Sequence, residues 1–136
     1  MHKAQQAMGP CYFEVAQVYI GMCRKDCLPK AMHNLQEDLS LCRGFRTRCT
    51  ASQMPRARVT EAKTLLSMAN VHYQSGDLEK AITVAQDAAR VCSLAGSTGT
   101  EVLANIEANV EVYRMVRVAH HDVSLADAAF QSSSTC

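Results

Sequence analysis

Residues 60–96 carry two consecutive helical stripes of apolar residues. Each stripe repeats every three or four residues, which is the spacing of one face of an α-helix. Between them lies Ser-Gly-Asp at 75–77, where the glycine can adopt the left-handed conformation that ends a helix and the aspartate can cap the next. We therefore predict an antiparallel helix hairpin with Thr60 as its N-cap and Gly96 at its end. The stripes are Leu65, Met68, Ala69 and His72, and then Leu78, Ala81, Ile82, Ala85, Ala88 and Cys92.

A short motif of Ala, an amide residue and Val, with a Tyr close behind, occurs three times, beginning at Ala16, Ala69 and Ala108. Repetition at intervals of a few tens of residues is typical of stacked helical repeats, in which each hairpin needs neighbours to bury its apolar face. The intervals are 53 and 39 residues, so an insertion is expected between the first and second units. We expect the three alanines to occupy equivalent inward positions, which would bring the neighbouring amides together.

The chain is predicted to be a single all-α domain, residues 1–136, built from stacked antiparallel helix hairpins. Gly44 is expected to end one helix, and Pro55 lies in the arginine-rich stretch that follows, so this stretch is predicted to be an extended loop. A break is also expected near His121. The predicted parts are a first unit at 11–43, the loop at 44–59, a second unit at 60–96, a degenerate third unit at 100–130 and a tail at 131–136.

Residues 62–94 resemble one tetratricopeptide repeat. Leu65 stands at the family's first large position, Met68-Ala69 replaces its Leu-Gly or Leu-Ala pair, and Gly76-Asp77-Leu78 matches its turn. The period near 40 is similar to the longer repeats of kinesin light chains and of the polarity scaffolds that regulate G-proteins. The resemblance implies an α-solenoid, in which the antiparallel hairpins stack with a right-handed superhelical twist. It also implies a non-catalytic adaptor or scaffold, with cytoskeletal or cortical partners, that binds an extended peptide or a helix on its concave face.

In that family the first helices of successive repeats line the concave face. The resemblance therefore implies a set of groove residues in this chain, most of them amides. A side-chain amide offers donors and an acceptor, so a row of amides can bracket the backbone of an extended peptide. The competing explanation is that these amides are simply tolerated on a solvated face. The candidate peptide-binding residues are Gln17, Asn70, Gln74, Asn105, Asn109 and Tyr113.

Five arginines and no acidic residue lie between positions 43 and 58, which suggests a second function. Such a segment could bind an acidic polymer, namely RNA, a tubulin tail or a phosphopeptide. It contains one aromatic residue, Phe45, so a base-stacking platform is not expected. A solvated loop with an incidental charge is the competing explanation. The arginines are Arg43, Arg46, Arg48, Arg56 and Arg58.

Composition narrows the classes of function that remain possible for the chain. The formal net charge is only +1, which argues against a dedicated nucleic-acid binder. The sequence has no apolar run of membrane-spanning length and no secretory signal at its start, so we expect a cytoplasmic protein. Its seven cysteines form no CxxC pair, and we expect them to be reduced thiols. We expect no metal, cofactor or catalytic site, although a cysteine-dependent enzyme stays open as a third class. Three units are near the minimum for a stable stack, so self-association or a longer repeat array is also expected.

Overall fold

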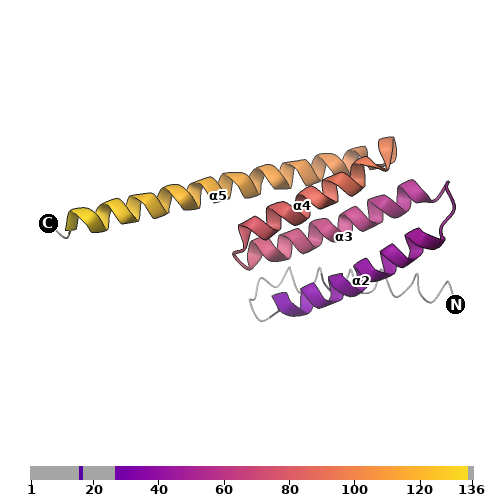
Figure 1. The fold of residues 1–136 in the computed structure, drawn as a ribbon, viewed down its shortest axis with the longest axis horizontal. Helices are drawn as coiled ribbons and strands as arrows, with labels where there is room; N and C mark the ends of the chain where they lie inside the picture. Colours follow the sequence, from indigo (N-terminus) through magenta and orange to yellow (C-terminus); the bar gives the residue numbers. More distant parts are fainter. Residues whose placement is uncertain (1–15, 17–26, 135–136) are drawn as a thin grey trace.

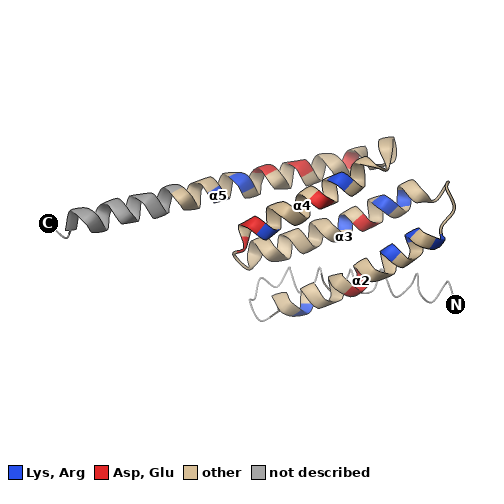
Figure 2. Ribbon diagram, in the orientation of Figure 1, with Lys and Arg blue, Asp and Glu red and all other residues tan. Residues whose placement is uncertain are grey.

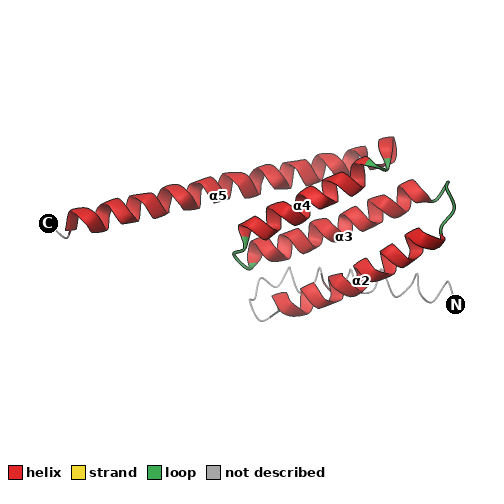
Figure 3. Cartoon of the chain, viewed as in Figure 1, coloured by secondary structure: helices red, strands yellow, loops and turns green. Residues whose placement is uncertain are grey.

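The computed structural model describes residue 16 and residues 27–134, with side chains described as far as residue 121. Residues 27–134 form long helices that pack beside one another, and no strand occurs in the described part (Figures 1 and 3). The predicted all-α class is therefore confirmed. The elements are α2 at Leu28–Arg48, α3 at Met54–Gln74, α4 at Leu78–Ser93, a short 3₁₀ turn η1 at Gly96–Gly99, and α5 at Thr100–Ser134.

The predicted hairpin is present as α3 and α4. Gly76 has a φ of 89°, and the backbone N–H of Asp77 donates to the carbonyl of His72 at 2.9 Å, which satisfies a carbonyl at the end of α3. Asp77 then caps α4, because its side chain accepts a hydrogen bond from the backbone N–H of Lys80 at 3.1 Å. Gly96, with a φ of 64°, follows the end of α4 as expected.

The hairpin starts earlier than the sequence indicated. Helix α3 begins at Met54, so Thr60 lies inside the helix and its hydroxyl donates to the carbonyl of Arg56 at 3.0 Å. The prediction of Thr60 as the N-cap is wrong. Pro55 does not prevent this longer helix because it lies in the first turn, where its missing N–H would have had no partner.

The predicted extended loop at 44–59 is also wrong. Helix α2 continues through Gly44 to Arg48, and only residues 49–53 connect α2 to α3 (Figure 3). A glycine inside a helix costs about 1 kcal/mol relative to alanine, which a packed helix face can outweigh. All five arginines of this stretch are therefore helical: Arg43, Arg46 and Arg48 in α2, and Arg56 and Arg58 in α3.

The third unit is not a hairpin. Helix α5 is continuous from Thr100 to Ser134 and passes through His121 without a break (Figure 1). No glycine or proline occurs between these ends, so nothing in the local chemistry would interrupt the helix. The predicted break is wrong, and the helix includes most of the predicted tail at 131–136.

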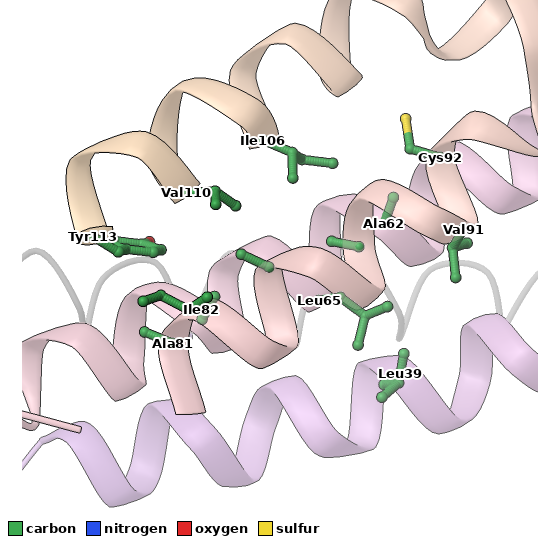
Figure 4. Packing of buried hydrophobic residues seen from close by; sticks show 13 residues of the cluster. Leu39, Ala62, Leu65, Ala81, Ile82, Val91, Cys92, Ile106, Val110 and Tyr113 are labelled. Atoms are coloured by element: carbon green, nitrogen blue, oxygen red, sulfur yellow. The ribbon is translucent and has the colours of Figure 1, made fainter. Parts of the chain in front are cut away.

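The core lies among α3, α4 and α5, with Leu39 of α2 at its edge (Figure 4). Small residues on the facing sides of α3 and α4 allow the helices to approach closely, and larger side chains of α5 cover them. Cys92 is fully buried in this core. In this core the fully buried alanines are Ala62, Ala69, Ala81, Ala85 and Ala88, and the buried residues from α5 are Ile106, Val110 and Tyr113.

The three repeated alanines are not equivalent. Ala16 and Ala69 are fully buried, as predicted, but Ala108 is exposed. The side of α5 that faces the core carries Ile106 and Val110 instead, two residues to either side of Ala108. The motif therefore lies on a different face of α5. The prediction that the three alanines occupy equivalent inward positions is wrong.

Candidate functional site

Helices α3 and α5 are joined by a polar and aromatic contact at the predicted groove. The hydroxyl of Tyr113 in α5 donates a hydrogen bond to Oδ1 of Asn70 in α3. The ring of Tyr113 also stacks on Tyr73 of α3, with ring centroids 5.0 Å apart and an interplanar angle of 29°. Two of the predicted site residues, Asn70 and Tyr113, are thus brought together and bind each other.

Tyr113 belongs to the core and does not line an exposed groove. Only 2% of it is exposed. Burial removes the hydration of the phenolate and raises the pKa of Tyr113 to about 12, with a further contribution from Tyr73. The hydroxyl is therefore a neutral donor at physiological pH. The prediction that Tyr113 meets a peptide directly is wrong; its role is to attach α5 to α3.

The other predicted groove residues have more accessible side chains. Asn105 is exposed, and Gln74 and Asn109 are half-buried. Nδ2 of Asn109 donates to the backbone carbonyl of Asn105 at 2.8 Å, which holds the two residues on one side of α5. Gln17 lies outside the described residues. The amides of α3 and α5 are therefore placed on two neighbouring helices.

The arginines near the α2–α3 connection surround a buried acid. Nη1 of Arg46 lies 2.7 Å from Oε1 of Glu61, and Nε of Arg43 lies 3.7 Å from Oε2. Only 2% of the Glu61 side chain is exposed. Figure 2 shows the basic residues gathered at this end of α2 and α3. Glu61 neutralises part of the charge of these arginines. The surface around residues 43–58 is therefore less basic than the five arginines in the sequence suggest.

The remaining arginines differ in their exposure. Arg48 and Arg56 are exposed, and Arg58 is half-buried. Nε of Arg48 donates to the carbonyl of Gly44 at 3.1 Å, which is a local bond along its own helix. These three guanidinium groups are the ones that an acidic partner would meet.

A second polar cluster lies beside the arginines, between α2 and α3. The hydroxyl of Thr64 donates to Oδ2 of Asp38 at 2.6 Å, and the thiol of Cys42 donates to the same oxygen at 3.8 Å. Asp38 is only 4% exposed. Burial raises the pKa of Asp38, although the bonds from Thr64 and Cys42 counteract part of that effect.

Sequence reasoning missed this cluster. Asp38, Cys42 and Arg46 are spaced by four residues on α2, so they lie on one face and meet Glu61 and Thr64 of α3. That spacing was the available signal. It was hidden because the helix was expected to end at Gly44, before Arg46.

Two of the described thiols, those of Cys42 and Cys92, are poorly suited to nucleophilic chemistry. Burial, with an added contribution from the charge of Asp38, raises the pKa of Cys42 to about 12, and burial also raises the pKa of Cys92. A reactive cysteine needs a depressed pKa, because the thiolate is the nucleophile. Among residues 27–121, no three histidine, cysteine or acidic side chains are grouped to hold a metal ion.

Helix α5 presents an apolar surface that sequence reasoning did not single out. Val112, Met115 and Val118 are 49%, 63% and 56% exposed. A shallow depression on α5 is lined by Glu111, Arg114, Met115, Val118 and Ala119. None of the described helices combines the length and the apolar character that crossing a bilayer would require.

Comparison of the chain with protein-family models, with curated proteins and with solved structures finds no match.

Proposed function

We propose that the chain is a non-catalytic protein-interaction module in which a tetratricopeptide-like stack binds an extended peptide or a helix along its α3–α5 face. In this proposal α2 ends the first unit, α3 and α4 form the second, and α5 begins the third. The hairpins then stack as a right-handed solenoid, in which first helices are neighbours on the concave side. The resemblance of residues 62–94 to a tetratricopeptide repeat is the source of this assignment.

The observation that carries the proposal is the contact between Asn70 of α3 and Tyr113 of α5. A hydrogen bond and a ring stack between these helices make them direct neighbours although α4 separates them in sequence. Such skipping of the second helix is what a stack of hairpins requires. The Asn70–Tyr113 pair then serves as the floor of the groove and not as a ligand contact.

The groups offered to a ligand are those beside this floor. Asn105 and Asn109 on α5, and Gln74 on α3, are at least partly exposed and carry amides that can bond an extended peptide backbone. Half-buried Leu66 on α3 and Val102 on α5 contribute apolar area on the same two helices. A polar rim around a small apolar centre is the usual composition of a protein interface.

The test is selection of binders from a random-peptide library against the full chain, followed by affinity measurements with substituted chains. Asn109→Ala, alone and with Asn105→Ala, should weaken a selected peptide tenfold or more, equivalent to about 1.4 kcal/mol. Asn34→Ala is the matched control. Asn34 in α2 is also half-buried and its Nδ2 also bonds the carbonyl four residues earlier, at 2.8 Å.

If all selected peptides retain their affinity for the Asn105→Ala/Asn109→Ala chain, the groove assignment is overturned.

The acidic-polymer alternative makes a different prediction, because phosphate-rich ligands lose affinity steeply as salt rises. It is the weaker candidate, since Arg43 and Arg46 are paired with Glu61. If it were correct, Arg56→Glu would abolish binding and the asparagine substitutions would not.

A further inference from the structure

Helix α5 extends well beyond the other helices. Arg117 of α5 still forms an ion pair with α4, in which its Nη1 lies 3.1 Å from Oε1 of Glu79 in the first turn of α4. From there α5 continues to Ser134 with no other described helix beside it (Figure 1). At 1.5 Å per residue this overhang is about 25 Å long. Most helices of that length are stable in water only when one face is packed.

A regular apolar stripe runs along this part of the helix. Its six members are spaced alternately by four and three residues, which is the heptad pattern of a coiled-coil seam. Val112 is 49% exposed, Val116 is half-buried and Ala119 is exposed, so the beginning of the stripe is accessible. Val123, Ala126 and Phe130 are assigned to the stripe from their sequence spacing along the helical backbone of α5. The members of this seam are Val112, Val116, Ala119, Val123, Ala126 and Phe130.

The seam is separate from the face by which α5 joins the bundle. Ile106, Val110 and Tyr113 form the buried stripe of α5. At 100° per residue, the seam lies about 130° around the helix from that stripe. The described core among α3, α4 and α5 therefore does not cover the seam, and α5 carries a second apolar face.

We propose that the seam pairs with the same seam of a second copy of this chain to form a two-stranded coiled coil. Val116 and Val123 lie seven residues apart, at the position of the heptad where two-stranded coiled coils often carry β-branched side chains. Ala119 and Ala126 alternate with these larger residues and allow close approach of the helices. A heptad stripe on one helix is self-complementary under a two-fold axis, which is the commonest symmetry of protein oligomers.

Charge supports a second copy over an unlike partner. The stretch from Glu111 to Ser134 contains two basic and three acidic residues, so it is nearly neutral. Two copies would not repel each other, and the stretch offers no strong field that would select a partner of opposite charge. Asn105 and Asn109 lie seven residues before Val112 and Val116, so the seam continues along the same face of α5 beyond the peptide groove. The two sites are distinguished by position, because Val123 lies about 20 Å along the helix from Asn109.

Sedimentation equilibrium of the full chain tests the proposal. At concentrations from about 1 to 100 µM, a range in which weak and tight dimers both become visible, the wild type should reach twice the mass of one chain. Val116→Glu should reduce the dimer at least a hundredfold, because it puts a charge into the seam. Val118→Glu is the matched control: it makes the same change two residues away, off the seam at a 56% exposed position, and should leave the dimer intact.

Val123→Glu keeps the test valid if Val116→Glu disturbs the bundle, since it falls in the overhang. Circular dichroism of the diluted chains should show equal helicity for the two off-core variants, Val118→Glu and Val123→Glu. A monomeric wild type at 100 µM, well above the dissociation constant of a micromolar dimer, would overturn the proposal. Equal weakening of the dimer by Val118→Glu and Val123→Glu would also overturn it, because the interface would not then follow the seam.

Discussion

The guanidinium of Arg46 in α2 donates a hydrogen bond of 2.7 Å to the carboxylate of Glu61 in α3, and only 2% of the Glu61 side chain is exposed. A carboxylate in such a position has lost most of its hydration, so its cationic partner must replace what water supplied. The pair also joins the two helices at a single register, because a shift of either helix by one turn would separate the two groups.

Replacing Arg46 with alanine should therefore destabilise the chain by about 3 kcal/mol, since it leaves the Glu61 charge buried without its closest partner. The second arginine, Arg43, lies 3.7 Å from the same carboxylate and would compensate only in part. Urea denaturation followed by circular dichroism measures the change. Arg48→Ala, at an exposed position with a local bond, should change the stability by no more than about 0.5 kcal/mol. Equal effects of the two substitutions would show that the buried pair contributes nothing.

The Asp38 carboxylate gives the stability a distinct pH dependence. Burial raises its folded-state pKa above the ordinary value of 3.8, so between pH 3.8 and the raised pKa the folded chain binds more protons than the unfolded chain. Stability contributed by this group is therefore lost as the pH rises through that window. Asp38→Asn cannot ionise and should lose less stability than the wild type between pH 4 and 7.

Thr64→Val provides the complementary variant. The hydroxyl of Thr64 lowers the pKa of Asp38 through its hydrogen bond, so its removal should extend the sloping part of the stability profile to higher pH. Denaturant titrations at several pH values distinguish the three chains. If wild type and Asp38→Asn change stability in parallel with pH, the carboxylate is not desolvated as described.

The part of the fold that could be predicted from sequence is the part governed by local chemistry. The turn at Gly76 and the cap at Asp77 are specified by a positive φ and by a side chain that accepts a backbone N–H. Apolar periodicity around Leu65 and Ile82 then identified the faces of α3 and α4 that form the core. Each of these signals spans only a few residues, so a single sequence is enough to recognise it.

The elements that could not be predicted depend on packing between distant segments. Gly44 resembles a helix end, but the contacts that α2 makes with α3 through Asp38 and Arg46 outweigh its low propensity. The candidate groove was affected in the same way. Tyr113 looked like a ligand contact on the sequence, and its hydrogen bond to Asn70, 43 residues earlier, removes it from the surface.

Tyr113→Phe should separate the hydrogen bond from the packing of the ring. Loss of the bond to Asn70 should cost about 1 kcal/mol at neutral pH, because Asn70 is half-buried and can bond to water instead. The pKa of Tyr113 is raised from 10.0 to about 12, so the wild type should lose stability as the pH rises from 10 to about 12. That loss should be absent from Tyr113→Phe.

Ultraviolet titration of the phenolates measures the same group directly. The chain has four tyrosines, and the wild type should show a late phase near pH 12 that Tyr113→Phe lacks. Asn70→Ala is the control, since it removes the hydrogen bond but keeps a buried phenol and should retain the late phase. A late phase that persists in Tyr113→Phe would assign it to another residue.

Two glycines in helical segments should respond to alanine in opposite directions. A Cβ at Gly99 would lie 2.8 Å from the carbonyl oxygen of Cys92 and 2.9 Å from its sulfur, and the backbone oxygen cannot move aside easily. Gly99→Ala should therefore destabilise the chain by about 2 kcal/mol. A Cβ at Gly44 would meet nothing closer than Nη2 of Arg48 at 3.8 Å, so Gly44→Ala should stabilise α2 by about 0.5–1 kcal/mol. Urea denaturation measures the free energy of unfolding of both variants. A destabilised Gly44→Ala would contradict the continuous α2 helix. An unchanged stability of Gly99→Ala would contradict the close packing of η1 on Cys92.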